Sequence, residues 1–117
     1  MEQPDNQTLY LRLGVTPAQL SAFCRDAQIS EFALFGSILR NDFRPDSDID
    51  ILVSFINPDT LSLIDFVDLE YRLENWLKRD VDLVHKMTVE EDRNWLRRQE
   101  ILEKYQVIYE SRPVLSS

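Results

Sequence analysis

The chain has 117 residues and a formal net charge of −8, with 21 acidic against 13 basic side chains. Hydrophobic residues make up 44% of it, which is enough to bury a core and argues against a disordered chain. The acidic balance argues against a surface that binds nucleic acid or an anionic membrane, because both kinds of binding use clustered lysine and arginine. Cys24 is the only cysteine, which excludes an internal disulfide and a cysteine-based zinc cluster.

We expect a single domain over residues 1–117, with loose tails at 1–10 and 112–117. The N-terminus lacks the basic and apolar regions of a signal peptide. No apolar run approaches the roughly 18 residues that a membrane span requires. These features predict a cytoplasmic protein.

The first half of the chain predicts a helix followed by two strands. Thr16 can cap a helix that apolar spacing carries over about 17–28. A hydrophobic strand is expected over 29–35, and strict alternation of side chains predicts a second strand over 48–55. The residues between these strands are expected to form a short helical turn over 38–43 and then a loop.

The second half predicts two helices and a third strand. We expect a helix over about 60–78, a strand over 81–85 and a helix over about 88–105. Residues 107–109 are expected to form a short terminal strand or to extend that last helix. The side chains expected to face the core from these helices are Leu63, Phe66, Val67, Leu73, Trp76, Leu77, Trp95, Leu96 and Leu102. This order of elements predicts an α+β (α/β-like) fold, in which helices back a small mixed β-sheet mainly on one face.

Two carboxylates stand where the second strand begins. Asp48 and Asp50 are two residues apart, so their side chains leave the same face of a strand with Cα atoms about 6.6 Å apart. Carboxylates held this close repel each other, and an all-oxygen ligand set favours Mg²⁺ or Mn²⁺ over zinc. Such a pair on the solvated face of a strand is also common without any function, so it indicates a metal site only in combination with other features.

Gly36 and Ser37 supply such a feature, because they follow the first strand directly. Glycine lets the backbone approach a ligand closely, and the Ser37 hydroxyl can donate a hydrogen bond to a phosphate. A strand, Gly-Ser, ten residues and Asp-x-Asp together place a phosphate cradle beside a carboxylate pair. Arg40 and Arg44 could offset the charge of a triphosphate or be ordinary surface arginines, and the sequence does not decide between these interpretations.

Asp82 offers a third carboxylate on the strand expected over 81–85. If that strand pairs beside the 48–55 strand, Asp82 reaches the same site. Three carboxylates that hold two cations suit phosphoryl or nucleotidyl transfer, and Asp82 could also act as general base. Asp80 shares its face and is the alternative base, although a solvated strand end is the simpler interpretation.

These motifs resemble the signature of the DNA polymerase beta-like nucleotidyltransferase superfamily. In length the chain is similar to the minimal nucleotidyltransferases (MNT), the antitoxins of HEPN/MNT toxin–antitoxin pairs, and the similarity covers about residues 16–110. The resemblance implies a short mixed sheet backed by helices. It assigns the metal-binding and catalytic acids to Asp48, Asp50 and Asp82, and the triphosphate contacts to Gly36 and Ser37.

The resemblance further implies transfer of AMP from ATP, with two Mg²⁺ ions, to a tyrosine hydroxyl of a HEPN ribonuclease toxin within a hetero-oligomer. The chain departs from the family at Asn41, where members often have glycine; asparagine tolerates a left-handed backbone, so the turn should survive. Two alternatives remain open: an antitoxin that masks the toxin by binding alone, and a nucleotidyltransferase that acts on a small molecule or RNA ends.

Overall fold

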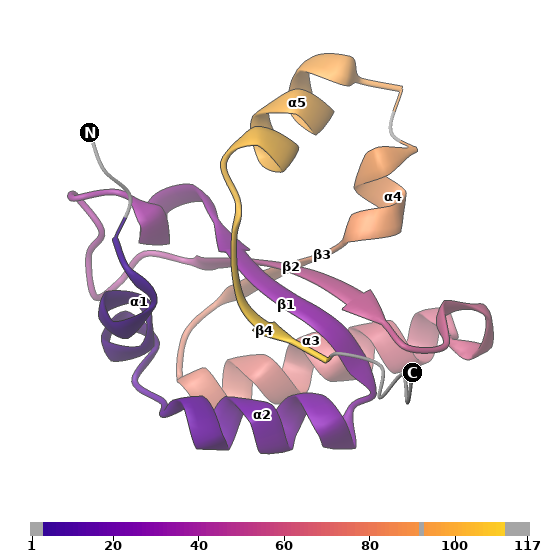
Figure 1. Ribbon diagram of the computed structural model, residues 1–117, viewed down its shortest axis with the longest axis horizontal. Helices are drawn as coiled ribbons and strands as arrows, with labels where there is room; N and C mark the ends of the chain where they lie inside the picture. The colour runs from indigo at the N-terminus through magenta and orange to yellow at the C-terminus, as the bar shows by residue number, and fades with distance from the viewer. Residues whose placement is uncertain (1–3, 92, 112–117) are drawn as a thin grey trace, which may run out of the picture.

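The computed structural model describes residues 4–91 and 93–111, and it confirms the predicted α+β fold with a mixed sheet (Figure 1). In chain order the elements are α1 (Asn6–Leu13), α2 (Pro17–Asp26), β1 (Ile29–Phe35), η1 (Gly36–Leu39), β2 (Ile49–Phe55), η2 (Pro58–Thr60), α3 (Leu63–Leu77), β3 (Val81–His85), α4 (Lys86–Glu90), α5 (Trp95–Glu103) and β4 (Gln106–Glu110). Among the described residues, no helix combines the length and apolar character needed to cross a membrane.

The four strands form one sheet in the order β3-β2-β1-β4. β1 runs antiparallel to both β2 and β4, whereas β2 and β3 are parallel. A parallel pair requires a crossover connection, which α3 supplies. The strand that carries Asp82 therefore lies directly beside the strand that carries Asp50.

Helices cover the two faces of the sheet unequally. α1, α2 and α3 lie on one face, and α4 and α5 lie on the other (Figure 1). The larger apolar cluster lies under the first three helices and includes Leu9, Leu20 and Leu73. A smaller cluster lies under α4 and α5 and includes Val89 and Ile101. Helices therefore cover both faces of the sheet, and the expectation of coverage mainly on one face describes only the larger core.

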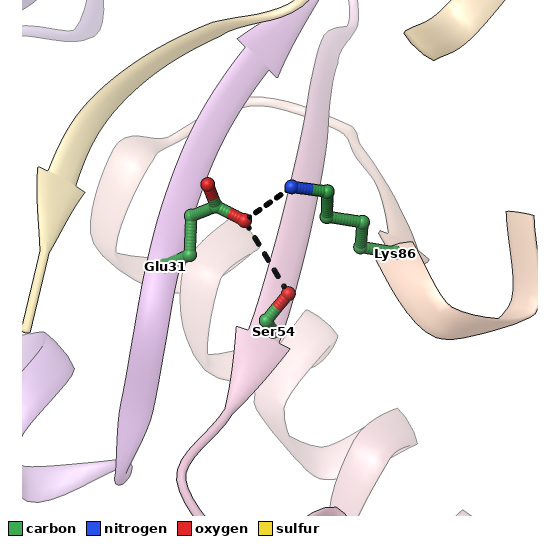
Figure 2. A network of polar contacts seen from close by, with 3 residues as sticks. All are labelled: Glu31, Ser54 and Lys86. Atoms are coloured by element: carbon green, nitrogen blue, oxygen red, sulfur yellow. Dashed lines mark hydrogen bonds and ion pairs between the residues drawn. The ribbon is translucent and has the colours of Figure 1, made fainter. Parts of the chain in front are cut away.

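A half-buried ion pair fastens α4 and α5, here called the α4–α5 pair, to the sheet (Figure 2). Lys86 Nζ, at the start of α4, lies 2.9 Å from Glu31 Oε1 on β1, and Ser54 Oγ lies 3.5 Å from the same oxygen. The Lys86 ammonium also lies 4.9 Å from the ring centroid of Tyr105, shortly after α5. Burial alone would lower the pKa of Lys86, but hydrogen bonds to Tyr105 and Glu31 outweigh it and raise that pKa.

The N-terminal tail expected over 1–10 is wrong for residues 6–10, which belong to α1. Asp5 caps this helix, since its Oδ1 accepts from the Thr8 N–H at 2.8 Å. Leu9 and Leu13 are buried, and two apolar anchors in a polar stretch are too few to predict a helix. The tail expected at 112–117 lies outside the described residues.

The core face of α3 also differs from the prediction. Leu63 is 78% exposed and Val67 is 54% exposed, so the expectation that they face inward is wrong. Leu73 and Leu77 are buried as expected, and Leu69 lies in the same row. The helix carries apolar side chains on two sides, so periodicity alone cannot tell which side faces the sheet. Phe66 and Trp76, also expected inward, are partly buried against the core.

The single helix expected over 88–105 is two helices, α4 and α5. The Asn94 side chain accepts from the Arg97 N–H at 3.2 Å, which begins a new helix at Trp95. This start leaves Trp95 58% exposed and Leu96 62% exposed, so the expectation that they face inward is wrong. Leu102 packs partly buried against the smaller cluster, as expected.

Candidate active site

The sheet register brings the predicted site residues to one end of the sheet. Gly36 and Ser37 begin η1 directly after β1, and Asp50 lies on β2 opposite the last residue of β1. The parallel pairing sets Asp50 against Asp82 on β3. Asp48 lies just before β2 and shares the face of Asp50 by the two-residue repeat of a strand. Segments distant in sequence thus contribute to one cluster of acids.

Gly36 packs directly against the carboxylate of Asp50. Its φ of +74° lies in the left-handed region, which favours glycine. A Cβ added at Gly36 would collide with Asp50 Oδ2 and would lie 3.0 Å from its Cγ. Glycine is therefore required at position 36 for two reasons: the backbone conformation favours it, and the Asp50 carboxylate leaves no room for a Cβ.

Asp50 is the electrostatic centre of this cluster. Burial raises the pKa of Asp50 first, and the neighbouring charges of Asp82 and Asp48 raise it further. The Ser37 backbone hydrogen bond and the Arg40 cation lower it in part. A bound cation would relieve the repulsion that remains among the three carboxylates.

Ser37 joins the two halves of the motif. Its Oγ donates to the backbone oxygen of Asp48 at 3.4 Å, and its backbone bonds to Asp50. The helical turn expected over 38–43 begins earlier and is shorter, as the 3₁₀ turn η1. Both the hydroxyl and the backbone of Ser37 thus face the acids.

The donor set at this end of the sheet suits a hard cation that arrives with phosphate. Over the residues described, no group of three histidine, cysteine, aspartate or glutamate side chains is already arranged to hold a metal ion. Mg²⁺ usually binds through one or two carboxylates together with waters and substrate phosphates, and needs no closed protein cage. Asp48 and Asp82 are exposed and Asp50 is half-buried, so their oxygens are open to such a ligand.

The structure gives different surroundings to Arg40, Arg44 and Asp80, whose roles the sequence left open. The charge of Arg40 acts on Asp50, whereas the backbone carbonyl of Arg44 accepts from Arg79 at 3.4 Å. Asp80 lies just before β3, and its carbonyl oxygen accepts from the Ile49 N–H at 2.9 Å. Its backbone therefore closes the ladder between β2 and β3.

Asn41 does not use the left-handed backbone that asparagine tolerates. Among the described residues, positive φ angles other than that of Gly36 occur at Gly14, Gln28 and Lys78. The turn after η1 therefore needs no residue of glycine-like freedom at position 41. The chain does form a turn at 41–42, as expected from the sequence.

Two glutamates that no motif marked hold the edge strand that carries Asp82. Glu70 Oε2 accepts from the Leu83 N–H, and Glu74 Oε2 accepts from the Val81 N–H, each at 3.1 Å. Both glutamates lie on α3, four residues apart and so on one helix face. That spacing was visible in the sequence, but the identity of their partners depends on the fold.

Two arginines outside the motifs also contact the segment between β1 and β2. Arg12 and Arg79 each donate hydrogen bonds to backbone carbonyl oxygens of that segment. Arg12 lies on α1, a helix that the sequence did not predict, so no pattern could have indicated its role.

The sequence matches a known protein family over most of its length. Residues 18–108 match the family described as the nucleotidyltransferase domain. The chain belongs to this family. The resemblance seen in the Gly36-Ser37 and Asp-x-Asp motifs is thereby confirmed.

Relatives of this family member include protein adenylyltransferases and toxin–antitoxin complexes. Protein adenylyltransferase MntA of Thermococcus cleftensis is 43% identical over 61 residues, which are 52% of this chain and 60% of that protein. A chain of a toxin–antitoxin crystal structure with AMP-PNP aligns with a TM-score of 0.63 and 26% identity over 84% of this chain and 76% of that one. A chain of the complex between a tri-AMPylated Shewanella oneidensis HEPN toxin and its MNT antitoxin aligns with a TM-score of 0.57 and 25% identity, covering 88% and 73%.

Proposed function

We propose that this protein is an antitoxin that transfers AMP from ATP to a hydroxyl group, that of a tyrosine, on a HEPN ribonuclease toxin. The observation that carries the proposal is the register that sets Asp50 beside Asp82, with Gly36 packed on the Asp50 carboxylate. Family membership supports nucleotidyl transfer. Similarity to chains of toxin–antitoxin complexes, one with an AMPylated toxin, supports a protein acceptor.

Asp48, Asp50 and Asp82 are the residues that would hold two Mg²⁺ ions. Bound there, the ions would stabilise the charge on the entering and leaving oxygens of an in-line displacement. The crowding that raises the pKa of Asp50 is the repulsion that such ions would offset. Arg40, whose cation already acts on Asp50, would add positive charge beside the triphosphate.

The proposed step makes one bond and breaks one. The acceptor oxygen attacks the α-phosphorus of ATP, the bond from that phosphorus to the bridging oxygen breaks, and pyrophosphate leaves. The hydroxyl proton passes to the carboxylate of Asp82, an exposed side chain beside Asp50, with Asp80 as the alternative base. Gly36 lets the backbone pass directly against the Asp50 carboxylate, and the Ser37 hydroxyl donates to the backbone oxygen of Asp48.

Transfer of labelled AMP tests the proposal directly. The protein is incubated with ATP labelled at the α-phosphate, MgCl₂ and a purified HEPN-type ribonuclease, and labelled toxin is measured on a gel. We expect label on the toxin with wild type and its loss with the Asp48→Ala/Asp50→Ala double variant. The site of modification is then read by mass spectrometry, which we expect to identify a tyrosine.

A matched control distinguishes loss of the candidate site from loss of two negative charges elsewhere. Asp59→Ala/Glu110→Ala removes the same formal charge at exposed positions on η2 and β4 and should leave transfer intact. Absence of transfer by wild type, or undiminished transfer by Asp48→Ala/Asp50→Ala, would contradict the proposed activity.

A binding-only antitoxin is the second candidate, and one surface favours contact with a protein. Leu63, Ile64, Val67 and Tyr71 are each more than half exposed along the outer side of α3. Masking by contact alone predicts that Asp48→Ala/Asp50→Ala still rescues the growth of cells that express the toxin. Catalytic neutralisation predicts that this variant fails to rescue growth, so one assay distinguishes the two candidates.

A further inference from the structure

The segment that joins β1 to β2 carries both halves of the motif and depends in part on bonds from other elements. Its internal backbone bonds lie at its two ends: the Arg40 N–H donates to the Ser37 carbonyl at 2.9 Å, and the Ser47 N–H donates to the Arg44 carbonyl at 3.0 Å. Two side-chain bonds add to these, from the Arg44 N–H to Ser47 Oγ at 3.2 Å and from Ser37 Oγ to the Asp48 carbonyl at 3.4 Å. After η1 it has no regular structure until β2 begins. Such a segment keeps one conformation only if other elements offset the entropy of ordering it.

Arg12 of α1 supplies the first external attachment. Its Nη1 donates to the Ile38 carbonyl at 2.6 Å and to the Arg40 carbonyl at 2.7 Å. These carbonyls lie at the end of η1, where a helix leaves acceptors without partners inside the helix. The Arg12 guanidinium carbon also lies 5.7 Å from the centroid of the Phe43 ring.

Arg79, between α3 and β3, supplies the second attachment. Its Nη1 donates to the carbonyl oxygens of Arg44 and Ser47 at 3.4 Å and 3.3 Å. Its guanidinium carbon lies 4.6 Å from the centroid of the same Phe43 ring. Two arginines from distant parts of the sequence therefore contact one aromatic side chain in the middle of the segment.

The atoms that these arginines hold are adjacent to the candidate site. The carbonyl of Arg40 is one of them, and the Arg40 cation and the Ser37 backbone both act on Asp50. At the other end, Arg79 holds Ser47, the residue before Asp48. Loss of either attachment would allow a motif residue to move relative to Asp50.

We propose that Arg12 and Arg79, with Phe43 between them, form a clamp that positions the nucleotide-binding segment 36–48. Neither arginine is assigned a contact with substrate, so both are positioning residues. The expected effect on nucleotide binding rests on the proposed function. The hold of the clamp on the segment can be measured in the free protein, without nucleotide.

Hydrogen exchange of the free protein provides that measurement. In Arg12→Gln and Arg79→Gln we expect the amides of Arg40 and Ser47 to exchange about tenfold faster, because local opening becomes easier. The Ile49 amide, bonded to Asp80 in the sheet, should be unchanged. Arg25→Gln, which removes an exposed arginine from α2, is the matched control and should change none of the three.

Nucleotide affinity gives the second measurement. The probe is Mg²⁺ with an ATP analogue that carries a methylene group between the α- and β-phosphorus, so that AMP cannot be transferred. We expect Arg12→Gln and Arg79→Gln to raise its Kd by about tenfold, since displaced binding groups lose preorganised contacts. Arg12→Lys and Arg79→Lys keep a shorter donor and should fall between wild type and the glutamine variants in both measurements.

The two measurements separate the possible failures. Unchanged exchange of the Arg40 and Ser47 amides in the glutamine variants would overturn the clamp, as would equal acceleration across all strands, which would indicate loss of global stability. If a glutamine variant does not fold, the lysine variants are compared with wild type, and exchange identical to wild type in both would overturn it. If wild type bound no analogue, the proposed function would fail, and exchange would still decide whether Arg12 and Arg79 hold the segment.

Discussion

At the scale of single residues, Gly36 and Asp50 constrain each other. Gly36 adopts a positive φ and leaves no room for a Cβ beside the Asp50 carboxylate. Gly14 has a similar φ of +79°, but nothing lies within 4 Å of its Cβ position. Substitution at Gly14 therefore tests backbone strain alone, whereas substitution at Gly36 adds a steric conflict with Asp50.

Gly36→Ala is expected to lower the free energy of unfolding by about 2–5 kcal/mol, because strain and overpacking add. Gly14→Ala, the control, should lose only about 1–2 kcal/mol from strain. Urea unfolding measures both losses, and only the change at Gly36 should also weaken nucleotide binding. Equal losses of stability and equal affinities in the two variants would show that the contact with Asp50 is unimportant.

The charge of Asp50 predicts a dependence of stability on pH. Burial, Asp82 and Asp48 raise its pKa above the ordinary value of 3.8. Between 3.8 and the raised pKa, the folded chain retains a proton that the unfolded chain has released, so this group destabilises the fold as pH rises through that window. The destabilisation persists at neutral pH, where the carboxylate is ionised in both states.

Asp50→Asn removes that charge and is therefore expected to be more stable than wild type at neutral pH. The difference in unfolding free energy should shrink as pH falls through the window and vanish below 3.8. MgCl₂ should raise the melting temperature of wild type more than that of Asp50→Asn, because the ion offsets the same repulsion. Asp59→Asn, at an exposed position on η2, is the control. A stability difference independent of pH would contradict this account.

At the scale of elements, α3 shows how an apolar helix is oriented by its neighbours. Leu73 is fully buried against the sheet, whereas Leu63, ten residues earlier on the same helix, is 78% exposed. Both residues are leucine, so hydrophobicity cannot explain the difference. Packing against the sheet, together with the bonds of Glu70 and Glu74 to β3, sets the rotation of the helix.

Leu73→Ala is expected to destabilise the fold by about 2–5 kcal/mol, because it removes buried contacts and leaves a cavity. Leu63→Ala on the exposed side should change the unfolding free energy by no more than about 0.5 kcal/mol. Chemical denaturation of the two variants beside wild type measures the difference. Comparable losses would assign Leu63 to the core, as the periodicity of the sequence suggested.

The strands and the acid pair could be predicted because their signals are local. The alternation around Asp48 and Asp50 and the break at Gly36 do not depend on distant contacts. The burial of Leu73 and Leu77 on α3 could be predicted, but the exposure of Leu63 and the division between α4 and α5 could not, because the sheet and the Asn94 cap decide them. The register of Asp82 could be given only as a condition, since it requires the parallel pairing of β2 and β3.

At the scale of the whole molecule, the sheet separates two helical layers whose apolar cores differ in size. The larger core cluster joins α1, α2 and α3 to the sheet, whereas the smaller one holds the α4–α5 pair. The ion pair of Lys86 with Glu31 reinforces the weaker layer, and the side chains of the two are only 20% and 16% exposed. The α4–α5 pair should therefore open at a lower free energy than the rest of the fold.

Lys86→Met is expected to lower the unfolding free energy by about 1–3 kcal/mol, because Glu31 loses its cation while half-buried. Amides of α5 should exchange faster in this variant, whereas those of α2 on the opposite layer should change less. Lys86→Met/Glu31→Gln should recover part of the loss, since no unpaired charge then remains. If the double variant lost as much stability as the sum of the two single variants, the ion pair would not be what holds the α4–α5 pair to the sheet.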